Sequence, residues 1–131
     1  MLISSKGRYA IRVILDLAEH SNGEYIPLKD IAARQGISQK YMESIMTLLS
    51  KNDFVEAVHG KGGGYRLNKP AHEYKIGDIL RLTEGTLAPV SCLQEGAKPC
   101  ERVDTCRTVS LWTGLNEVIS NYLDNISIAD I

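Results

Sequence analysis

Residues 28–67, LKDIAARQGISQKYMESIMTLLSKNDFVEAVHGKGGGYRL, determine the fold that the sequence predicts. Their pattern indicates a helix, a tight turn, a second helix and then a two-stranded hairpin. In the first helix Ile31 and Ala32 are expected to face inward, and Ala32 is small enough for two helices to cross closely. Gly36 can adopt the positive φ that a sharp turn between helices requires, and Ser38 is a suitable N-cap for the second helix.

The second helix of this segment has two different faces. Met42, Ile45 and Leu49 recur at the spacing of one helical face and form its apolar side. The opposite side carries polar groups that can hydrogen-bond to base edges or phosphates, and they cluster where a recognition helix meets the major groove. The residues of this polar face are Gln39, Lys40, Tyr41, Glu43, Ser44 and Thr47.

The hairpin is expected to have strands at 55–59 and 65–67 with a glycine-rich connection at 60–64. Lys61 lies at its tip and Arg66 at or beside the tip, so positive charge is available for phosphates. A helix-turn-helix pattern alone occurs in many helical domains that bind no DNA. The glycine-rich basic hairpin that follows favours a winged helix-turn-helix. The predicted fold class is therefore mainly α with a small β-hairpin wing.

Composition supports a protein whose N-terminal half faces phosphates. The net charge of the 131 residues is −1, but residues 1–70 hold ten Lys and Arg against seven Asp and Glu, while residues 71–131 hold five against nine. The basic bias is mild, so affinity for DNA would require two copies or several hydrogen bonds. No apolar run approaches a membrane span, and charges interrupt the first apolar stretch, so we expect a cytoplasmic protein without a membrane partner.

Two further helices flank the central segment. The first is predicted from Ser4 or Ser5 to about His20, because apolar residues recur there at spacings of three and four. The second is a short helix at 76–82 that Gly85 ends. The basic residues early in the first helix are Lys6, Arg8 and Arg12. Their side chains either contact a DNA backbone or are simply solvated.

The last part of the chain predicts a helix from about Cys106 to Leu123 with an apolar seam of coiled-coil spacing. The seam residues are Trp112, Leu115, Ile119, Tyr122 and Ile126. The seam could pack on the protein's own core, but the core of a winged helix is already supplied by four helices and the hairpin. Pairing with a second subunit is therefore favoured, and a homodimer suits the recognition of two DNA half-sites.

These patterns divide the chain into three parts. Residues 1–84 form the predicted winged helix-turn-helix DNA-binding domain, residues 85–105 a cysteine-containing loop, and residues 106–131 a dimerisation helix and tail. A loop of this length inside a compact protein is usually functional or disordered.

The three cysteines of the chain, Cys92, Cys100 and Cys106, lie in this loop or just after it, with seven and five residues between them. An odd number in a cytoplasmic protein argues against a disulfide framework. Thiolates on a flexible loop select soft metals, which means zinc or an iron–sulfur cluster, and each requires a fourth ligand. The remaining alternative is three thiols buried as small apolar side chains. The spacing alone leaves these alternatives open.

Four motifs carry a resemblance to a known family. They are SSKGRY at 4–9, the turn and helix at 35–43, the wing GKGGGY at 60–65, and the cysteine trio followed by Leu111 and Trp112. Over nearly the whole chain, the sequence resembles the IscR-type branch of the Rrf2 family of bacterial winged-helix regulators. The resemblance implies a homodimer that binds double-stranded promoter DNA, senses an iron–sulfur cluster, and so adjusts synthesis of the cluster-assembly machinery.

The resemblance also implies roles for individual residues. Cys92, Cys100 and Cys106 are the expected cluster ligands, with a 2Fe–2S cluster as the first expectation and a 4Fe–4S cluster as the second. Tyr41, Glu43 and the wing are expected to reach DNA, with Lys40 at a neighbouring contact position. Together with the polar face described above, the expected DNA contacts are Ser38, Gln39, Lys40, Tyr41, Glu43, Ser44, His59, Lys61, Gly62 and Gly63.

Three positions depart from the family pattern. Val109 stands where the pattern has a histidine as fourth cluster ligand, and Arg8 stands where nitric-oxide-sensing relatives have an acidic ligand. The fourth ligand is therefore unassigned, and a small molecule or solvent is one alternative to the acidic side chains nearby. Those side chains are Glu95, Glu101 and Asp104. His59 stands where the family often has an arginine that can insert into the minor groove, and a neutral imidazole there would weaken that contact or make it pH-sensitive.

The favoured function is a ligand-gated repressor rather than an enzyme. No Ser/His/Asp arrangement is suggested, and the glycines at 60–64 lack the Gly-Lys-Ser/Thr ending of a phosphate-binding loop. The alternatives are a nitric-oxide- or redox-sensing regulator or a cysteine-metabolism regulator of the same family. A zinc- or thiol-based redox protein without specific DNA binding is the alternative from another class.

Overall fold

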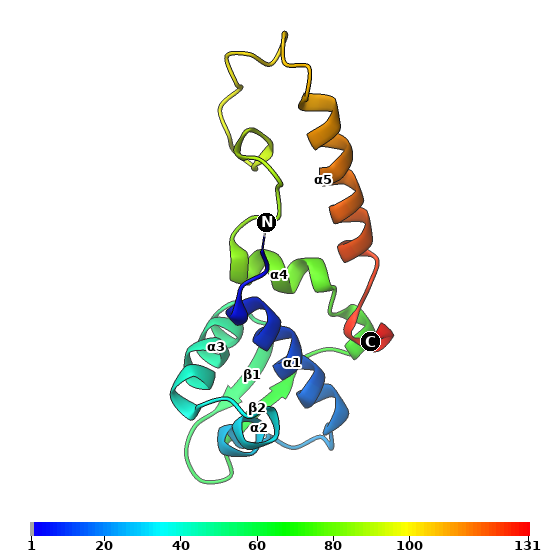
Figure 1. Cartoon of the computed structure of the whole chain (residues 1–131). Coiled ribbons are helices and arrows are strands. Elements are labelled where there is room, and N and C mark those ends of the chain that lie inside the picture. Colours follow the sequence, from blue (N-terminus) through cyan, green and yellow to red (C-terminus); the bar gives the residue numbers. More distant parts are fainter. Residues whose placement is uncertain (1) are drawn as a thin grey trace.

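A computed structural model describes residues 2–131 and consists of a winged helix from which an arm extends. In Figure 1 the arm, made of a long loop and the last helix, rises away from the other elements. The helices are α1 (Ser5–Glu19), α2 (Leu28–Gln35), α3 (Gln39–Lys51), α4 (Ile76–Glu84) and α5 (Val109–Asp124), and the strands are β1 (Val55–Val58) and β2 (Gly64–Leu67). Short 3-10 helices are Ala71–Glu73, Ser91–Leu93 and Ile128–Asp130. The mainly helical fold with a hairpin is as predicted.

The turn between α2 and α3 forms as the sequence predicts. Gly36 has a φ of 65° in the left-handed region, and its N–H caps the end of α2 on the carbonyls of Ala32 and Ala33. The Ser38 hydroxyl accepts a hydrogen bond from the Tyr41 N–H at 3.2 Å, which makes it the N-cap of α3. These two local features set the angle at which α3 leaves the turn.

The wing is an antiparallel pair in which Val55 lies opposite Leu67 and Val58 opposite Gly64. Ile26 adds a bridge to the second strand, because its N–H and carbonyl exchange hydrogen bonds of 2.8 and 2.9 Å with Tyr65. A Cβ at Gly64 would lie 2.2 Å from the Ile26 carbonyl oxygen, so only glycine permits this approach. The wing is thereby fixed to the segment that precedes α2.

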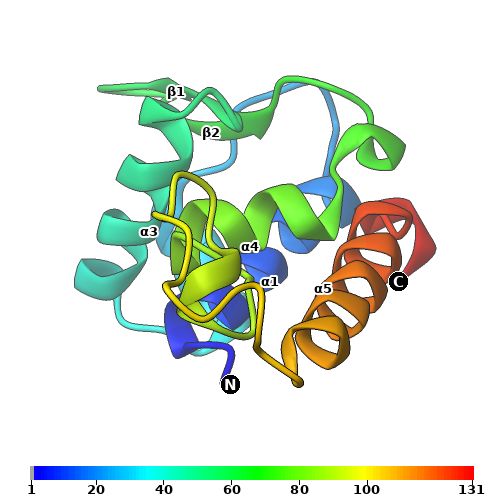
Figure 2. The same ribbon diagram turned by 90° about the horizontal axis from the view of Figure 1, so that it is seen from above.

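The hydrophobic core lies between α1, α2, α3 and α4, with β1 and the C-terminal segment closing it. The predicted inward residues Ile31, Met42, Ile45 and Leu49 are completely buried, and Ala32 is nearly so. Burial of such side chains contributes about 1.5–3 kcal/mol each. Seen from above, α4 lies between α3 on one side and α5 on the other (Figure 2).

Helix α5 differs from its prediction in two respects. It begins at Val109 rather than near Cys106. Ile119 and Ile126 pack against the core of the same chain, so the prediction that both lie on a seam between subunits is wrong. The physical reason is that the C-terminal end of α5 is docked on α4, where the Arg81 guanidinium donates to both Asp124 carboxylate oxygens at 2.6 and 3.0 Å.

Candidate DNA-binding surface and cysteine loop

The residues predicted to contact DNA come from the N-terminal half of α3 and from the hairpin tip. Tyr41 and Gly63 are partly buried. The exposed members of the set are Ser38, Gln39, Lys40, Glu43, Ser44, His59, Lys61 and Gly62. The exposed polar residues therefore lie at the start of α3 and in the wing. Burial, and after it the Glu43 carboxylate of α3, raises the pKa of Tyr65 in β2.

Tyr41 has a structural contact in addition to its predicted role. Its ring and the Tyr9 ring of α1 form a T-shaped pair, with the centroids 5.7 Å apart and the planes 83° to each other. The Ser44 hydroxyl donates to the Tyr41 carbonyl at 2.7 Å, which leaves its oxygen able to accept a hydrogen bond from DNA. Replacement of Tyr41 therefore affects packing as well as any contact with a base.

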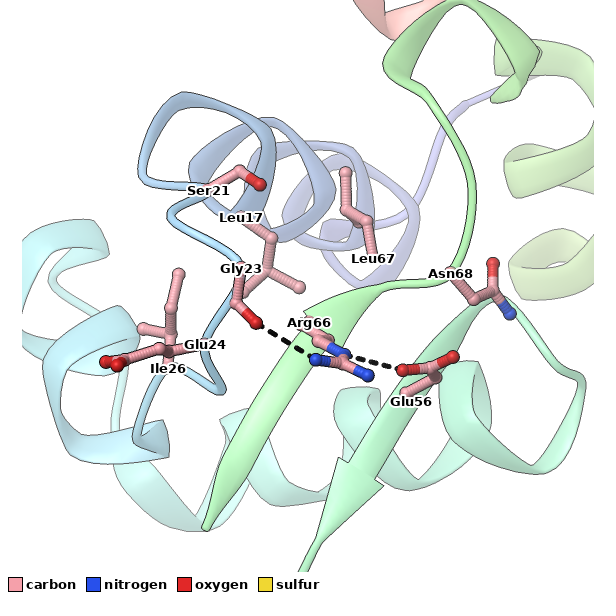
Figure 3. A pocket seen from close by; sticks show the side chains of 9 residues that line it. All are labelled: Leu17, Ser21, Gly23, Glu24, Ile26, Glu56, Arg66, Leu67 and Asn68. Atoms are coloured by element: carbon pink, nitrogen blue, oxygen red, sulfur yellow. Dashed lines mark hydrogen bonds and ion pairs between the residues drawn. The ribbon is translucent and has the colours of Figure 1, made fainter. Parts of the chain in front are cut away.

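Arg66 is engaged within the protein rather than at the hairpin tip, where the sequence suggested it. It lies in β2 opposite Glu56, and its Nε donates to the Glu56 carboxylate at 2.6 Å. Its Nη1 donates to the Gly23 carbonyl at 3.0 Å, and the guanidinium lies 4.3 Å from the centre of the Tyr25 ring. Figure 3 shows Arg66 with Glu56 and Gly23 at a cavity of about 260 Å³. Arg66 thus connects the wing to the loop after α1.

A buried carboxylate connects α1 to α2. Asp16 is 1% exposed and accepts hydrogen bonds from Arg34 at 2.7 and 3.0 Å and from Gln35 at 2.8 Å. Burial alone would raise the pKa of Asp16, but the hydrogen bonds and charge of its partners outweigh burial and lower it. Arg12 of α1 donates to the side-chain oxygen of Gln35 at 3.0 Å and also to its backbone carbonyl. The last turn of α2 is therefore held by α1.

The segment 85–108, here called the cysteine loop, joins α4 to α5. Cys92 and Cys100 are exposed, Cys106 is half-buried, and all three are free thiols. A hydrogen bond with the Thr108 hydroxyl at 3.4 Å, together with nearby backbone N–H groups and the Arg102 charge, lowers the pKa of Cys106. An accessible thiol with a lowered pKa favours the thiolate that metals bind.

Within residues 2–131, no three His, Cys, Asp or Glu side chains converge closely enough to hold a metal ion. The structure therefore does not bring the three cysteines into one site, although their donor chemistry suits a soft metal. Val109 is the first residue of α5. The acidic residues considered as fourth ligands, Glu95, Glu101 and Asp104, are exposed. Arg8 donates to the Ser5 hydroxyl at 3.0 Å.

The outer side of α5 carries an exposed apolar stripe, which we call the α5 stripe. Its residues are Leu111, Leu115, Val118 and Tyr122, which are 59%, 39%, 65% and 66% exposed. The spacing of 4, 3 and 4 residues is that of a helix-pairing seam. The predicted seam shares Leu115 and Tyr122 with it, but Leu111 and Val118 were not part of that prediction. The helix contains two overlapping apolar repeats, and the sequence does not reveal which one the core covers.

Similarity to known proteins identifies the family of this chain. Residues 3–131 match the Rrf2 family, described as an iron-dependent transcriptional regulator. The chain belongs to the Rrf2 family. Curated Rrf2 relatives include the HTH-type transcriptional regulator IscR of Serratia proteamaculans, which is 41% identical over 131 residues that cover all of this chain and 79% of that protein. IscR of Yersinia enterocolitica is 40% identical with the same coverage.

Solved Rrf2-type structures have the same fold. The structure of T. potens IscR matches with a TM-score of 0.76 and 34% identity, covering 99% of this chain and 85% of that one. The global cysteine regulator CymR of B. subtilis matches with a TM-score of 0.78 and 29% identity, covering 99% and 95%. This Rrf2 member is thus a winged-helix, DNA-binding transcriptional regulator and not an enzyme. In residues 2–131, every helix is too short or too polar to cross a bilayer.

Proposed function

We propose that this Rrf2 regulator is a cytoplasmic homodimer that represses promoters of iron–sulfur cluster assembly genes and senses an iron–sulfur cluster. The observation that carries the proposal is the position of the three thiols. All three lie in or at the end of one loop that joins the winged helix to α5, and none is sequestered in the core. The IscR name of relatives that align with the whole chain supports the same function.

In this proposal each of the three parts of the chain has its own role. Residues 1–84 bind DNA, residues 85–105 together with Cys106 bind the cluster, and the rest of residues 106–131 pair the subunits. In the DNA complex, α3 lies in the major groove, where Tyr41 and Glu43 contact bases. Ser38, Gln39, Lys40 and Ser44 contact neighbouring bases or phosphates. His59, Lys61, Gly62 and Gly63 bring the wing to the backbone or minor groove.

Cys92, Cys100 and Cys106 would hold the cluster, with a 2Fe–2S cluster preferred over a 4Fe–4S cluster. When bound, the cluster supplies a link between the thiolates that depends on iron supply and on oxidation. The chain's own contribution is a loop whose two ends continue into α4 and α5, so the distance between its cysteines is related to the placement of both helices. The fourth ligand is left unassigned, because Val109 has no donor atom.

The α5 stripe is the proposed subunit interface. Four exposed apolar side chains at a helix-pairing spacing gain the free energy of burial only against another surface. A second copy of the stripe supplies such a surface, and two recognition helices then match a two-fold operator. In analytical ultracentrifugation we expect Val118→Asp to shift the protein to monomer and Thr113→Asp, an exposed change on the opposite side of α5, to leave the dimer intact. A dimeric Val118→Asp variant would contradict this interface.

Anaerobic purification tests the sensing function. We expect a coloured protein with visible absorption and with bound iron and sulfide, and we expect Cys92→Ala, Cys100→Ala or Cys106→Ala to remove the colour. A triple variant that stays coloured would exclude the cysteine loop as the ligand source. A colourless protein with zinc would favour the zinc or thiol alternative. Iron-free protein that binds its operator would favour a metal-free regulator of the same family.

A further inference from the structure

The last residue of α4 holds the first turn of α1. One carboxylate oxygen of Glu84, Oε1, accepts hydrogen bonds from the Ser4 N–H at 2.9 Å and from the Ser4 hydroxyl at 2.7 Å. The same Ser4 oxygen accepts from the Gly7 N–H at 3.1 Å, so Ser4 is the N-cap of α1. Hydrogen bonds to an ionised carboxylate are stronger than those between neutral groups. Residues 80 apart in the chain are thereby joined.

The two helices touch at this point with no intervening side chain from α1. A Cβ at Gly7 would lie 2.4 Å from Glu84 Oε1, 3.0 Å from the Thr83 hydroxyl and 3.2 Å from a Leu80 methyl group. Gly7 is buried, and its φ is not positive, so glycine is required here for space rather than for backbone conformation. A displacement at the end of α4 therefore reaches the start of α1 directly.

Glu84 also borders the cysteine loop. It lines a cavity of about 440 Å³ together with Leu93, Gln94 and Glu95, which follow Cys92 in the chain. The remaining walls of this cavity come from Arg81 of α4, from the start of the loop and from α5. Glu84 thus lies between the cap of α1 and the part of the loop nearest to Cys92.

From α1 the contacts continue to both helices of the helix-turn-helix. Tyr9 meets Tyr41 of α3 edge to face, and Arg12 donates to Gln35 at the end of α2. The guanidinium of Arg12 also lies 5.2 Å from the centre of the Tyr9 ring. The orientation of α1 is therefore tied to the orientation of the recognition helix.

We propose that Glu84 is a positioning residue that transmits changes in the cysteine loop to α1 and, through α1, to α3. Its biological meaning rests on the proposed function, but the physical link itself exists in the metal-free chain. The link requires that the arrangement of the loop alters the Glu84–Ser4 contact. A purely structural clamp would stabilise the fold without responding to the loop.

Hydrogen exchange on the metal-free, full chain distinguishes these roles. The probe is iodoacetamide, which alkylates the thiols, and the readout is the exchange rate of the Gly7 and Arg8 N–H groups, which bond to Ser4. In the parent protein we expect alkylation to change these rates at least about threefold. In Glu84→Ala we expect no response, and Glu84→Gln, which keeps an acceptor oxygen, should restore part of it.

Two further variants exclude indirect effects. Ser4→Asp retains a good N-cap for α1 but places a second carboxylate against Glu84, so we expect loss of the response with a normal helix. Glu73→Ala changes an exposed carboxylate before the opposite end of α4 and should respond like the parent. Ser4→Asp also provides the test if Glu84→Ala does not fold.

The proposal is overturned if alkylation leaves α1 of the parent protein unchanged. It is equally overturned if Glu84→Ala, or Ser4→Asp in its place, responds as the parent does. Failure of the proposed function has a different signature, namely purified protein without iron or without operator binding. Neither of those results alters the exchange measurement, so the two proposals fail separately.

Discussion

The winged helix and the cysteine loop differ in what fixes their geometry. In the winged helix, the candidate DNA contacts stand on helices and strands held by buried side chains, by the Asp16 ion pair and by the close approach at Gly64. The cysteine loop has one short 3-10 helix at Ser91–Leu93, and two of its three thiols are exposed. Folding alone therefore determines the geometry of the candidate DNA-binding surface. The geometry of a metal site in the loop would be determined only when the metal binds.

The largest expected effect is the loss of the buried carboxylate that orders the winged helix. We expect Asp16→Ala to lower the free energy of unfolding by about 3 kcal/mol, because it leaves Arg34 and Gln35 without their shared acceptor. This loss is at the low end for a broken buried ion pair, because the Arg34 side chain can turn to water. Urea denaturation measures the change, with Glu19→Ala, an exposed position on α1, as control. Equal losses in both variants would contradict a specific role for Asp16.

The Asp16 carboxyl group also predicts how the free energy of unfolding depends on pH. The folded-state pKa of Asp16 is lowered, so its stabilisation is complete above the unfolded pKa of about 3.9 and is lost as the pH falls through the folded value. We therefore expect the stability difference between the parent and Asp16→Asn to be large at neutral pH and to shrink in acid. Denaturation series at several pH values measure it. A difference that is constant across this range would show that the carboxylate charge is not responsible.

A smaller effect is expected at the recognition helix. Tyr41→Ala should weaken specific DNA binding by about 1–3 kcal/mol if the side chain contacts a base edge. Because Tyr41 also packs on Tyr9, Tyr41→Phe is the sharper variant. It keeps the ring and removes only the hydroxyl. Fluorescence anisotropy with operator and random duplexes measures both, and a Tyr41→Phe variant as weak as Tyr41→Ala would assign the loss to the hydroxyl rather than to packing.

The wing should contribute to DNA binding mainly through the charge of its lysine. We expect Lys61→Ala to weaken binding to all sequences alike and to reduce the slope of log affinity against log salt by about one unit, because it removes one phosphate contact. Lys51→Ala, at the C-terminal end of α3, is the matched exposed lysine and should leave the slope unchanged. Salt titration of the dissociation constant measures both. Identical slopes for Lys61→Ala and the parent would remove Lys61 from the DNA interface.

The smallest expected effect concerns the loop. Replacement of Cys92, Cys100 and Cys106 together by Ser should change the stability of the metal-free protein by no more than about 0.5 kcal/mol, as for other surface substitutions. Urea denaturation of anaerobically prepared, metal-free protein measures it. A loss of several kcal/mol would mean that the thiols belong to the fold, and the contrast between the two regions would disappear.

Local signals in the sequence predicted the winged helix well. Gly36 and Ser38 specify the turn by their own backbone and capping chemistry, and the apolar spacing of Met42, Ile45 and Leu49 identifies the buried side of α3. The hydrogen-bond partners of Asp16 and Arg66 were not predictable, because they are contributed by distant segments. A lone acidic residue on the apolar side of a predicted helix was the available signal for Asp16.

The arm was predicted less well for a physical reason. Helix α5 has apolar residues on adjoining faces, and periodicity cannot tell which face meets α4 and which stays exposed on the chain. The Arg81–Asp124 ion pair decides this, and it joins residues 43 apart in sequence. The spacing of the cysteines predicted which kind of metal their thiolates would bind. It did not predict whether the three thiols lie close together, because no local motif determines the geometry of the loop.

The arginines of the winged helix have a consequence for how the regulator would search a genome. Arg34 and Arg66 pair with Asp16 and Glu56 of the same chain, so the charge of these two arginines is committed to internal contacts. Sequence-independent binding to a polyanion scales with the number of phosphates neutralised. Each arginine held in this way is one fewer phosphate contact, which weakens retention on bulk chromosomal DNA and so reduces competition with the operators.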